Sequence, residues 1–307
     1  MNKPTIRSGE SAIVFGANGF LGSVITKRLY ETGYEVLPII RPGANIPRLQ
    51  DLGGTKILEV EASKWREIIG EHKPSIVICA QWNGVLKQDR ENLELQNSNI
   101  EPILNIAIAA KESGAENFLC FGSQAEAKES TEPIFEKFYD SGKSAYGIAK
   151  TKLHKHLASL FEHSDCRFIW ARVFSVYGPS DFSDSLLTQL FESQVSGNKL
   201  AISNPLKLCS FLYQDDFASA IEQILINPSV ANIVNIGNPK FHEIREIVAM
   251  CHGSTVDDSV GNEAISTNLG FFPDLTKLIA IDWTPKITLE EGIERTRKAF
   301  IYRTETK

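Results

Sequence analysis

Cysteine is scarce in this sequence, and its placement excludes two classes of site. No Cys-x-x-Cys pair occurs, and the cysteines are widely separated along the chain. The five residues are Cys79, Cys120, Cys166, Cys209 and Cys251. This spacing suits neither a disulfide framework nor a metal site, so we expect reduced thiols, no bound metal and a cytoplasmic location.

Long apolar runs and an excess of positive charge are also missing. No stretch approaches the roughly 18 apolar residues of a membrane span, and the opening MNKPTIRSGE lacks the apolar core of a signal peptide. The formal net charge of −6 gives no reason to expect a nucleic-acid partner. A content of 42% hydrophobic and 23% charged residues is ordinary for a globular protein, so we expect neither a membrane nor a nucleic acid as partner.

Residues 11–30 predict a strand, a glycine turn and a helix in that order. Residues 12–15 form a short apolar run rich in strand formers, and the apolar residues of 22–30 follow helical spacing. Between them Gly16, Gly19 and Gly22 recur at three-residue intervals. A glycine turn that leads from a buried strand into a helix is typical of a dinucleotide-binding site.

Each glycine has a physical role in such a site. Gly16 permits the tight turn, Gly19 lets the backbone approach a pyrophosphate, and Gly22 lets helix and strand pack closely. The backbone at Phe20, Leu21 and Gly22 opens the helix, whose free N–H groups and partial positive charge attract an anion. The stretch therefore predicts the phosphate-binding part of a cofactor site.

Strand-like and helical segments alternate through the first half of the chain. Predicted strands lie at residues 12–15, 35–40, 56–60, 75–80, 117–121 and 167–173. Predicted helices lie at residues 22–30, 64–70, 97–113 and 144–162. Solidly apolar strands that alternate with helices indicate an α/β fold with a doubly wound parallel sheet of the Rossmann type.

Beyond residue 173 the pattern becomes irregular. We expect helices at 185–195, 215–226 and 290–301 and a short strand at 232–236. The prediction is an NAD(P)-binding Rossmann domain of residues 1–173 plus about 211–230. A smaller C-terminal substrate-binding lobe would comprise residues 174–210 plus 231–307.

The end of the second strand bears on the choice of cofactor. In NAD-binding Rossmann folds an acidic residue at this place takes the ribose hydroxyls, whereas an arginine accommodates the 2′-phosphate of NADP. Here Arg41 follows the strand and no Asp or Glu is present. NADP(H) is therefore favoured, NAD stays possible, and Arg48 is a second candidate phosphate partner.

Three residues form a candidate catalytic set. Tyr146 and Lys150 stand four residues apart at the start of a predicted helix, so both side chains share one face. A nearby ammonium favours the phenolate of a tyrosine, which otherwise has a pKa of about 10. Ser123 follows the fifth strand, at the sheet edge where such folds bind ligands, and could donate a hydrogen bond to a carbonyl oxygen.

These residues resemble the extended short-chain dehydrogenase/reductase superfamily, the NAD(P)-dependent epimerase/dehydratase family in particular. Asn99 is similar to the structural asparagine of that family. Further similar segments are ARVFSVYGP at 171–179, FLYQDD at 211–216, WTP at 283–285 and LEEG at 289–292. The resemblance implies Tyr146 as general acid/base, Ser123 as hydrogen-bond donor to the carbonyl, and Lys150 as the residue that holds the nicotinamide ribose. It also implies a homodimer built on the helices at 99–113 and 144–162.

Most members of this branch act on nucleotide-diphospho-sugars, and the sequence narrows the reaction. The dehydratases place Asp-Glu after the catalytic hydroxyl residue, whereas Gln124 and Ala125 stand here, so a dehydratase is rejected. Arg41 favours an NADP(H)-dependent reductase of a 4-keto-6-deoxyhexose nucleotide. An NAD-dependent 4-epimerase and a non-catalytic dinucleotide sensor or scaffold remain as alternatives.

Some positions depart from the family pattern. The signature asparagine before Val-Tyr-Gly is Ser175, and the arginine that often meets the substrate diphosphate is Cys209, so Lys207 or Lys199 could supply the lost charge. Trp82, Asn83 and Tyr177 are candidate residues of the substrate wall. We expect His154, His156 and His163 to form a solvated face.

Overall fold

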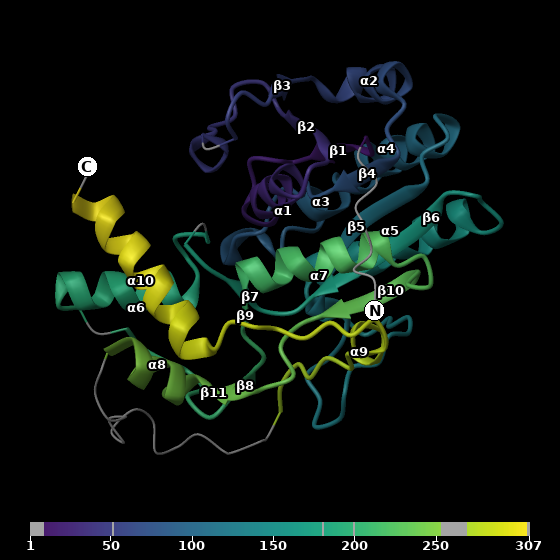
Figure 1. The fold of residues 1–307 in the computed structure, drawn as a ribbon. Helices are drawn as coiled ribbons and strands as arrows, with labels where there is room; N and C mark the ends of the chain where they lie inside the picture. Colours follow the sequence, from purple (N-terminus) through teal and green to yellow (C-terminus); the bar gives the residue numbers. More distant parts are fainter. Residues whose placement is uncertain (1–8, 51, 180, 199, 253–268, 306–307) are drawn as a thin grey trace.

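The computed structural model describes residues 9–50, 52–179, 181–198, 200–252 and 269–305. Its centre is a sheet of seven parallel strands in the order β10-β6-β5-β4-β1-β2-β3 (Figure 1). The strands are β1 (Ser11–Phe15), β2 (Glu35–Ile40), β3 (Leu58–Glu59), β4 (Ile76–Cys79), β5 (Asn117–Ser123), β6 (Arg167–Val173) and β10 (Asn232–Ile236). The predicted doubly wound α/β fold is confirmed.

Helices cover both faces of the sheet because successive strand residues point to opposite sides. In β1, Ala12 and Val14 join the core beneath α1 (Phe20–Glu31) and α7 (Gln214–Ile226). Ile13 and Phe15 join the core on the other face. That face is covered by α2 (Trp65–His72), α4 (Ile100–Glu112) and α5 (Ala145–Phe161).

A second group of elements forms the C-terminal part of the molecule, at the lower left of Figure 1. Its core joins Leu190, Phe191, Ile247 and Ile293. Its helices are α6 (Leu186–Ser196), α8 (Ile244–His252) and α10 (Leu289–Glu305). Its strands form two pairs, β7 (Val176–Tyr177) with β9 (Leu212–Tyr213) and β8 (Leu208–Cys209) with β11 (His242–Glu243).

One strand lies elsewhere than the sequence predicts. The sequence predicts the strand at 232–236 in the lobe, but as β10 it pairs with β6 at the edge of the main sheet. Helix α9 (Thr276–Ala280) packs against it, and Trp283 joins the core beneath α7. Which strand a short apolar segment pairs with depends on tertiary contacts, so its neighbour cannot be read from its own residues. The division into two domains otherwise stays a prediction.

The predicted helix at 97–113 is present, but it begins three residues later than predicted. The structure has α3 (Leu93–Asn97) and then α4, with Asn99 between them. The Asn99 side-chain amide donates to the carbonyls of Leu95 (3.0 Å) and Gln96 (3.2 Å), which interrupts the regular helix. No helix within the described ranges combines the length and the apolar character that crossing a membrane requires.

Candidate active site

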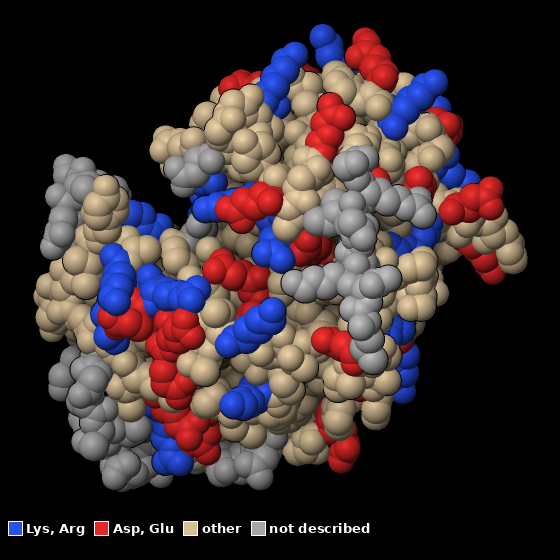
Figure 2. All heavy atoms as spheres, in the orientation of Figure 1, with Lys and Arg blue, Asp and Glu red and all other residues tan. Residues whose placement is uncertain are grey.

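A cleft of about 940 Å³ lies at the carboxyl ends of the sheet strands. Its wall includes the last residues of β1, β2, β5 and β6, namely Phe15, Ile40, Ser123 and Val173. Figure 2 shows a hollow between the part carrying β2 and β3 and the part carrying α6 and α10, with Lys and Arg side chains at its edge. Parallel sheets of this type bind ligands at this edge.

The glycine turn needs glycine at two of its positions for different reasons. Gly16 has φ +74°, and a Cβ there would lie 2.7 Å from the backbone of Gln81. A Cβ on Gly22 would lie 2.2 Å from the Gly16 carbonyl oxygen. The turn thus fits tightly between the β4 edge and α1. Gly16 and Gly19 line the cleft together with Phe20 and Leu21, whereas Gly22 serves the packing beneath it.

The start of α1 offers donors to an anion. Gly19 is the N-cap residue, and the first intrahelical bond runs from the Ser23 N–H to the Gly19 carbonyl (2.9 Å). The N–H groups of Phe20, Leu21 and Gly22 precede this bond, and the first turn contains no acidic residue. Free donors at the positive end of a helix dipole fit the pyrophosphate of a dinucleotide.

Two guanidinium groups line the part of the cleft next to this turn. Arg41 follows β2, is exposed, and donates to Asn83 Oδ1 (2.5 Å). Arg48 is half-buried, donates to the Asn18 carbonyl (3.3 Å) and lies 5.7 Å above the Phe182 ring. Burial lowers the pKa of Arg48. Arg41 and Arg48 are the two residues that the sequence predicts as partners of a 2′-phosphate, and both line the cleft.

Tyr146, Lys150 and Ser123 line the same cleft. Tyr146 and Lys150 follow one another along one face of α5, and the Lys150 Nζ lies 5.7 Å from the centre of the Tyr146 ring. Lys150 is buried, and its ammonium donates to the Phe121 carbonyl (2.7 Å) near the end of β5. The structure therefore brings the three predicted residues together at one place.

A close backbone contact fixes the start of α5 against the turn after Ser123. Ser144 caps the helix by accepting from the Gly147 N–H (3.1 Å). A Cβ on Gly147 would lie 2.1 Å from the Ala125 carbonyl oxygen. Since Ala125 is two residues beyond Ser123 and Gly147 follows Tyr146, this contact sets the separation of the two candidate catalytic side chains.

Trp82 closes the site around Lys150, a contact that the sequence analysis did not foresee. The Lys150 Nζ lies 3.7 Å from the centre of the Trp82 ring, within cation–π distance. The indole meets the Tyr146 ring edge-on, with centroids 5.8 Å apart. Its N–H donates to the buried Gln96 side chain (2.7 Å). Arg90 adds a second cation, 5.3 Å from the Tyr146 ring.

Asn99 holds the loop that carries Trp82. Its Oδ1 accepts from the Asn83 N–H (2.6 Å) and its amide donates to the Asn83 carbonyl (3.1 Å). Asn99 itself is buried. This pair of bonds fits the structural role that the resemblance implies for the residue. Asn83 and Trp82 both line the cleft, as the sequence analysis expected of wall residues.

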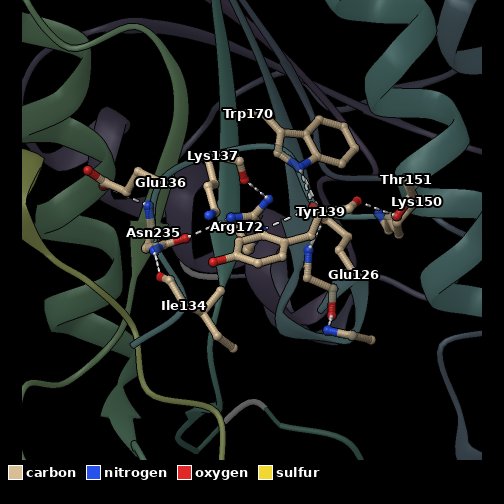
Figure 3. A network of polar contacts seen from close by, with 12 residues as sticks. Glu126, Ile134, Glu136, Lys137, Tyr139, Lys150, Thr151, Trp170, Arg172 and Asn235 are labelled. Atoms are coloured by element: carbon tan, nitrogen blue, oxygen red, sulfur yellow. Dashed lines mark hydrogen bonds and ion pairs between the residues drawn. The ribbon is translucent and has the colours of Figure 1, made fainter. Parts of the chain in front are cut away.

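A buried polar network holds the backbone of Ser123, and Figure 3 shows its members Glu126, Trp170 and Arg172. Glu126 accepts from the Ser123 N–H (2.7 Å), from the Trp170 indole (3.1 Å) and from Arg172 Nε (3.0 Å). Glu126 and Arg172 are 2% and 0% exposed. Arg172 also donates to Asn235 Oδ1 (3.2 Å) on β10. Ser-x-x-Glu after a strand is the pattern of a capping box and could have pointed to Glu126, whereas no sequence signal joins Glu126 to Arg172.

The Ser123 hydroxyl keeps its hydrogen available. Its Oγ accepts from the Ala125 N–H (3.2 Å), which is the local turn bond of a strand-ending serine. A hydroxyl that accepts one bond can still donate another. Ser123 thus combines a structural bond to the turn with a donor that can serve a ligand in the cleft.

Other expected residues fall in different surroundings. Tyr177 lines the cleft but is buried, and its hydroxyl donates to the Leu289 carbonyl (3.3 Å). Ser175 and Lys207 also line the cleft, whereas Cys209 is not among its wall residues and Lys199 lies outside the described residues.

The expectation of a solvated histidine face is wrong for His154. This side chain is buried against Phe138, Phe168 and Trp170, and burial lowers its pKa to about 4. Within the part of the chain that the structure describes, no three His, Cys, Asp or Glu side chains are grouped to hold a metal ion.

Comparisons with known proteins agree with this geometry. The sequence model of the NAD dependent epimerase/dehydratase family matches residues 12–237. GDP-L-fucose synthase 1 of Arabidopsis thaliana is 26% identical over 322 residues, which cover 94% of this chain and 93% of the relative.

Two solved structures share the fold. UDP-glucose 4-epimerase of Thermotoga maritima with UDP-glucose has a TM-score of 0.81 at 19% identity and covers 97% of this chain and 100% of its own. UDP-glucose 4-epimerase of Thermus thermophilus in complex with NAD has a TM-score of 0.81 at 22% identity and covers 95% and 99%.

Proposed function

The chain belongs to the NAD dependent epimerase/dehydratase family, and from this premise we propose that it is an NADP(H)-dependent reductase of a keto group on a nucleotide-activated sugar. The substrate that we would test first is a 4-keto-6-deoxyhexose nucleotide. The observation that carries the proposal is the meeting of Ser123, Tyr146 and Lys150 in the cleft that begins at the glycine turn.

The cleft residues fit a dinucleotide. The N–H groups at the start of α1 would hold its pyrophosphate, and Arg41 would pair with a 2′-phosphate. Arg48, which lines the same part of the cleft, could share that role. When bound, NADPH supplies a hydride for the carbonyl carbon of the substrate.

The side chains of this protein would manage the proton and the charge. Tyr146 gives its phenolic proton to the substrate oxygen, which becomes the hydroxyl of the product. Ser123 donates a hydrogen bond to that oxygen while negative charge develops on it. Lys150 favours the phenolate that Tyr146 becomes, and by the family resemblance it would also bind the nicotinamide ribose.

The test is NADPH oxidation, followed by absorbance, with a panel of keto-sugar nucleotides. The variant Tyr146→Phe should lose a factor of about a hundred or more in kcat, because it removes the general acid. Tyr30→Phe is the matched control, since Tyr30 lies on α1 outside the cleft wall and its hydroxyl contacts Gly53. Equal loss in both variants, or none in Tyr146→Phe, would remove Tyr146 from the reaction.

The cofactor preference has a separate test. Arg41→Ala should raise the KM for NADPH by about tenfold and leave that for NADH unchanged, because only NADPH carries the 2′-phosphate. An NAD-dependent 4-epimerase would instead retain NAD(H) through purification, which the absorbance of the purified protein reveals. A sensor or scaffold would bind the dinucleotide and turn over no sugar nucleotide.

We also propose a homodimer through α4 and α5. These helices pack side by side, and Ile148 on α5 and Leu93 on the neighbouring α3 are 48% and 56% exposed. The variant Ile148→Glu should therefore lower the mass measured by light scattering to that of one chain. The cytoplasmic location remains a prediction from cysteine usage.

A further inference from the structure

Three segments far apart in the sequence meet beside the cleft. Ser130 and Gly270 exchange backbone bonds, Ser130 N–H to Gly270 oxygen at 2.9 Å and Gly270 N–H to Ser130 oxygen at 3.1 Å. Gly270 also bridges to Leu208, so closely that a Cβ on Gly270 would lie 2.6 Å from the Leu208 carbonyl oxygen. This places Glu129, Lys207 and Phe271, each next to a bridged residue, together.

Lys207 faces the cleft from this junction. It lines the cleft together with Phe211 and Phe271, and its Nζ lies 5.4 Å from the centre of the Phe271 ring. The ammonium forms an ion pair with Glu129, and the two side chains are 27% and 39% exposed. A single ion pair with this exposure is weak in water, so an anion of higher charge can replace its carboxylate.

Lys207 is also the one cation that the C-terminal half adds to the described cleft wall. The other basic residues of that wall all precede residue 151. They are Arg41, Arg48, Lys87, Arg90 and Lys150. The neighbouring Cys209 supplies no positive charge, and burial raises the pKa of its thiol. An anionic group that enters along this wall therefore meets Lys207.

We propose that Lys207 binds the diphosphate of the sugar nucleotide and that Glu129 is its internal competitor. This assignment rests on the proposed substrate class. An ammonium serves a phosphate as a point charge with three donors, and it needs no fixed planar geometry. The diphosphate displaces the Glu129 carboxylate, and the Phe211 and Phe271 rings give that end of the cleft an apolar surface.

The test measures equilibrium binding of UDP and GDP by calorimetry, without cofactor or turnover, with uridine and guanosine as phosphate-free controls. The wild-type protein should bind one of the diphosphates more tightly than the matching nucleoside. Lys207→Ala should lose about tenfold of that affinity and Lys207→Arg should keep most of it, while nucleoside binding stays unchanged. Glu129→Gln should tighten diphosphate binding by about threefold, because the competing charge is gone.

Lys128→Ala is the matched control, since Lys128 is exposed beside Glu129 and is not part of the described cleft wall. Its diphosphate affinity should equal that of the wild type. The proposal is overturned if Lys207→Ala binds as tightly as the wild type, if Glu129→Gln binds more weakly, or if the wild type does not distinguish diphosphate from nucleoside. Intact diphosphate binding without reductase activity would instead refute only the proposed reaction.

Discussion

Replacement of Glu126 by alanine should destabilise the protein far more than the same replacement in an exposed ion pair. Glu126 and Arg172 are almost fully buried, and Glu126 accepts bonds from Ser123, Trp170 and Arg172. Glu126→Ala leaves the Arg172 guanidinium charged, buried and without its carboxylate. Breaking a buried pair in this way costs about 3–5 kcal/mol of the free energy of unfolding.

The matched control is Glu112→Ala. Glu112 pairs with Arg66 on the protein surface, where the Arg66 and Glu112 side chains are 65% and 52% exposed. Because water solvates both charges there, the loss should be about 0–1 kcal/mol. A third variant, Glu126→Gln, keeps an oxygen acceptor for the Ser123 N–H but removes the charge. It should lose most of what Glu126→Ala loses, since Arg172 stays unpaired.

The assay is urea unfolding followed by far-UV circular dichroism, with the free energies compared at equal slope. We expect a much lower midpoint for both Glu126 variants and an almost unchanged midpoint for Glu112→Ala. If Glu126→Ala shifts the midpoint no more than Glu112→Ala does, the network is not the stabilising element that its burial indicates.

Three further predictions concern the same region. Gly147→Ala should lower kcat/KM by about a hundredfold, because its Cβ would meet the Ala125 carbonyl at 2.1 Å and shift the catalytic side chains. Gly70→Ala on α2 should keep full activity, because an added Cβ there would meet no atom within 4 Å beyond its own stretch of helix backbone. Equal activity of Gly147→Ala and Gly70→Ala would contradict this prediction. The pKa of His154, about 4 when folded and 6.5 otherwise, means that the unfolded chain binds more protons between these values. Stability should therefore fall as the pH drops from 6.5 to 4. In thermal melts of His154→Gln this fall should be shallower, and identical slopes of stability against pH in the wild type and the variant would exclude His154 as its cause. Trp82→Leu should reduce kcat/KM about tenfold and Trp82→Phe less, since a phenyl ring keeps part of the attraction for Lys150; equal values for both would remove the cation–π contact from the explanation.

The sequence by itself determined the strands of the sheet and the glycine turn that follows β1. The apolar runs at residues 12–15, 76–79 and 168–171 indicate buried strands in a chain of this pattern, and the glycines at 16 and 22 have local steric causes. The four-residue spacing of Tyr146 and Lys150 places both side chains on one face of any helix. These inferences depend on neighbours along the chain, which a sequence displays directly.

Tertiary structure alone decided which residues surround that frame. The pairing of β10 with β6, the Glu126–Arg172 ion pair and the position of Trp82 over Lys150 join residues 46 to 68 positions apart. The same holds for Lys207 beside Glu129, and for His154, whose helical position gave no sign of the rings that bury it. Contacts of this kind form because packing selects one arrangement from many that the local pattern allows, so no single segment encodes them.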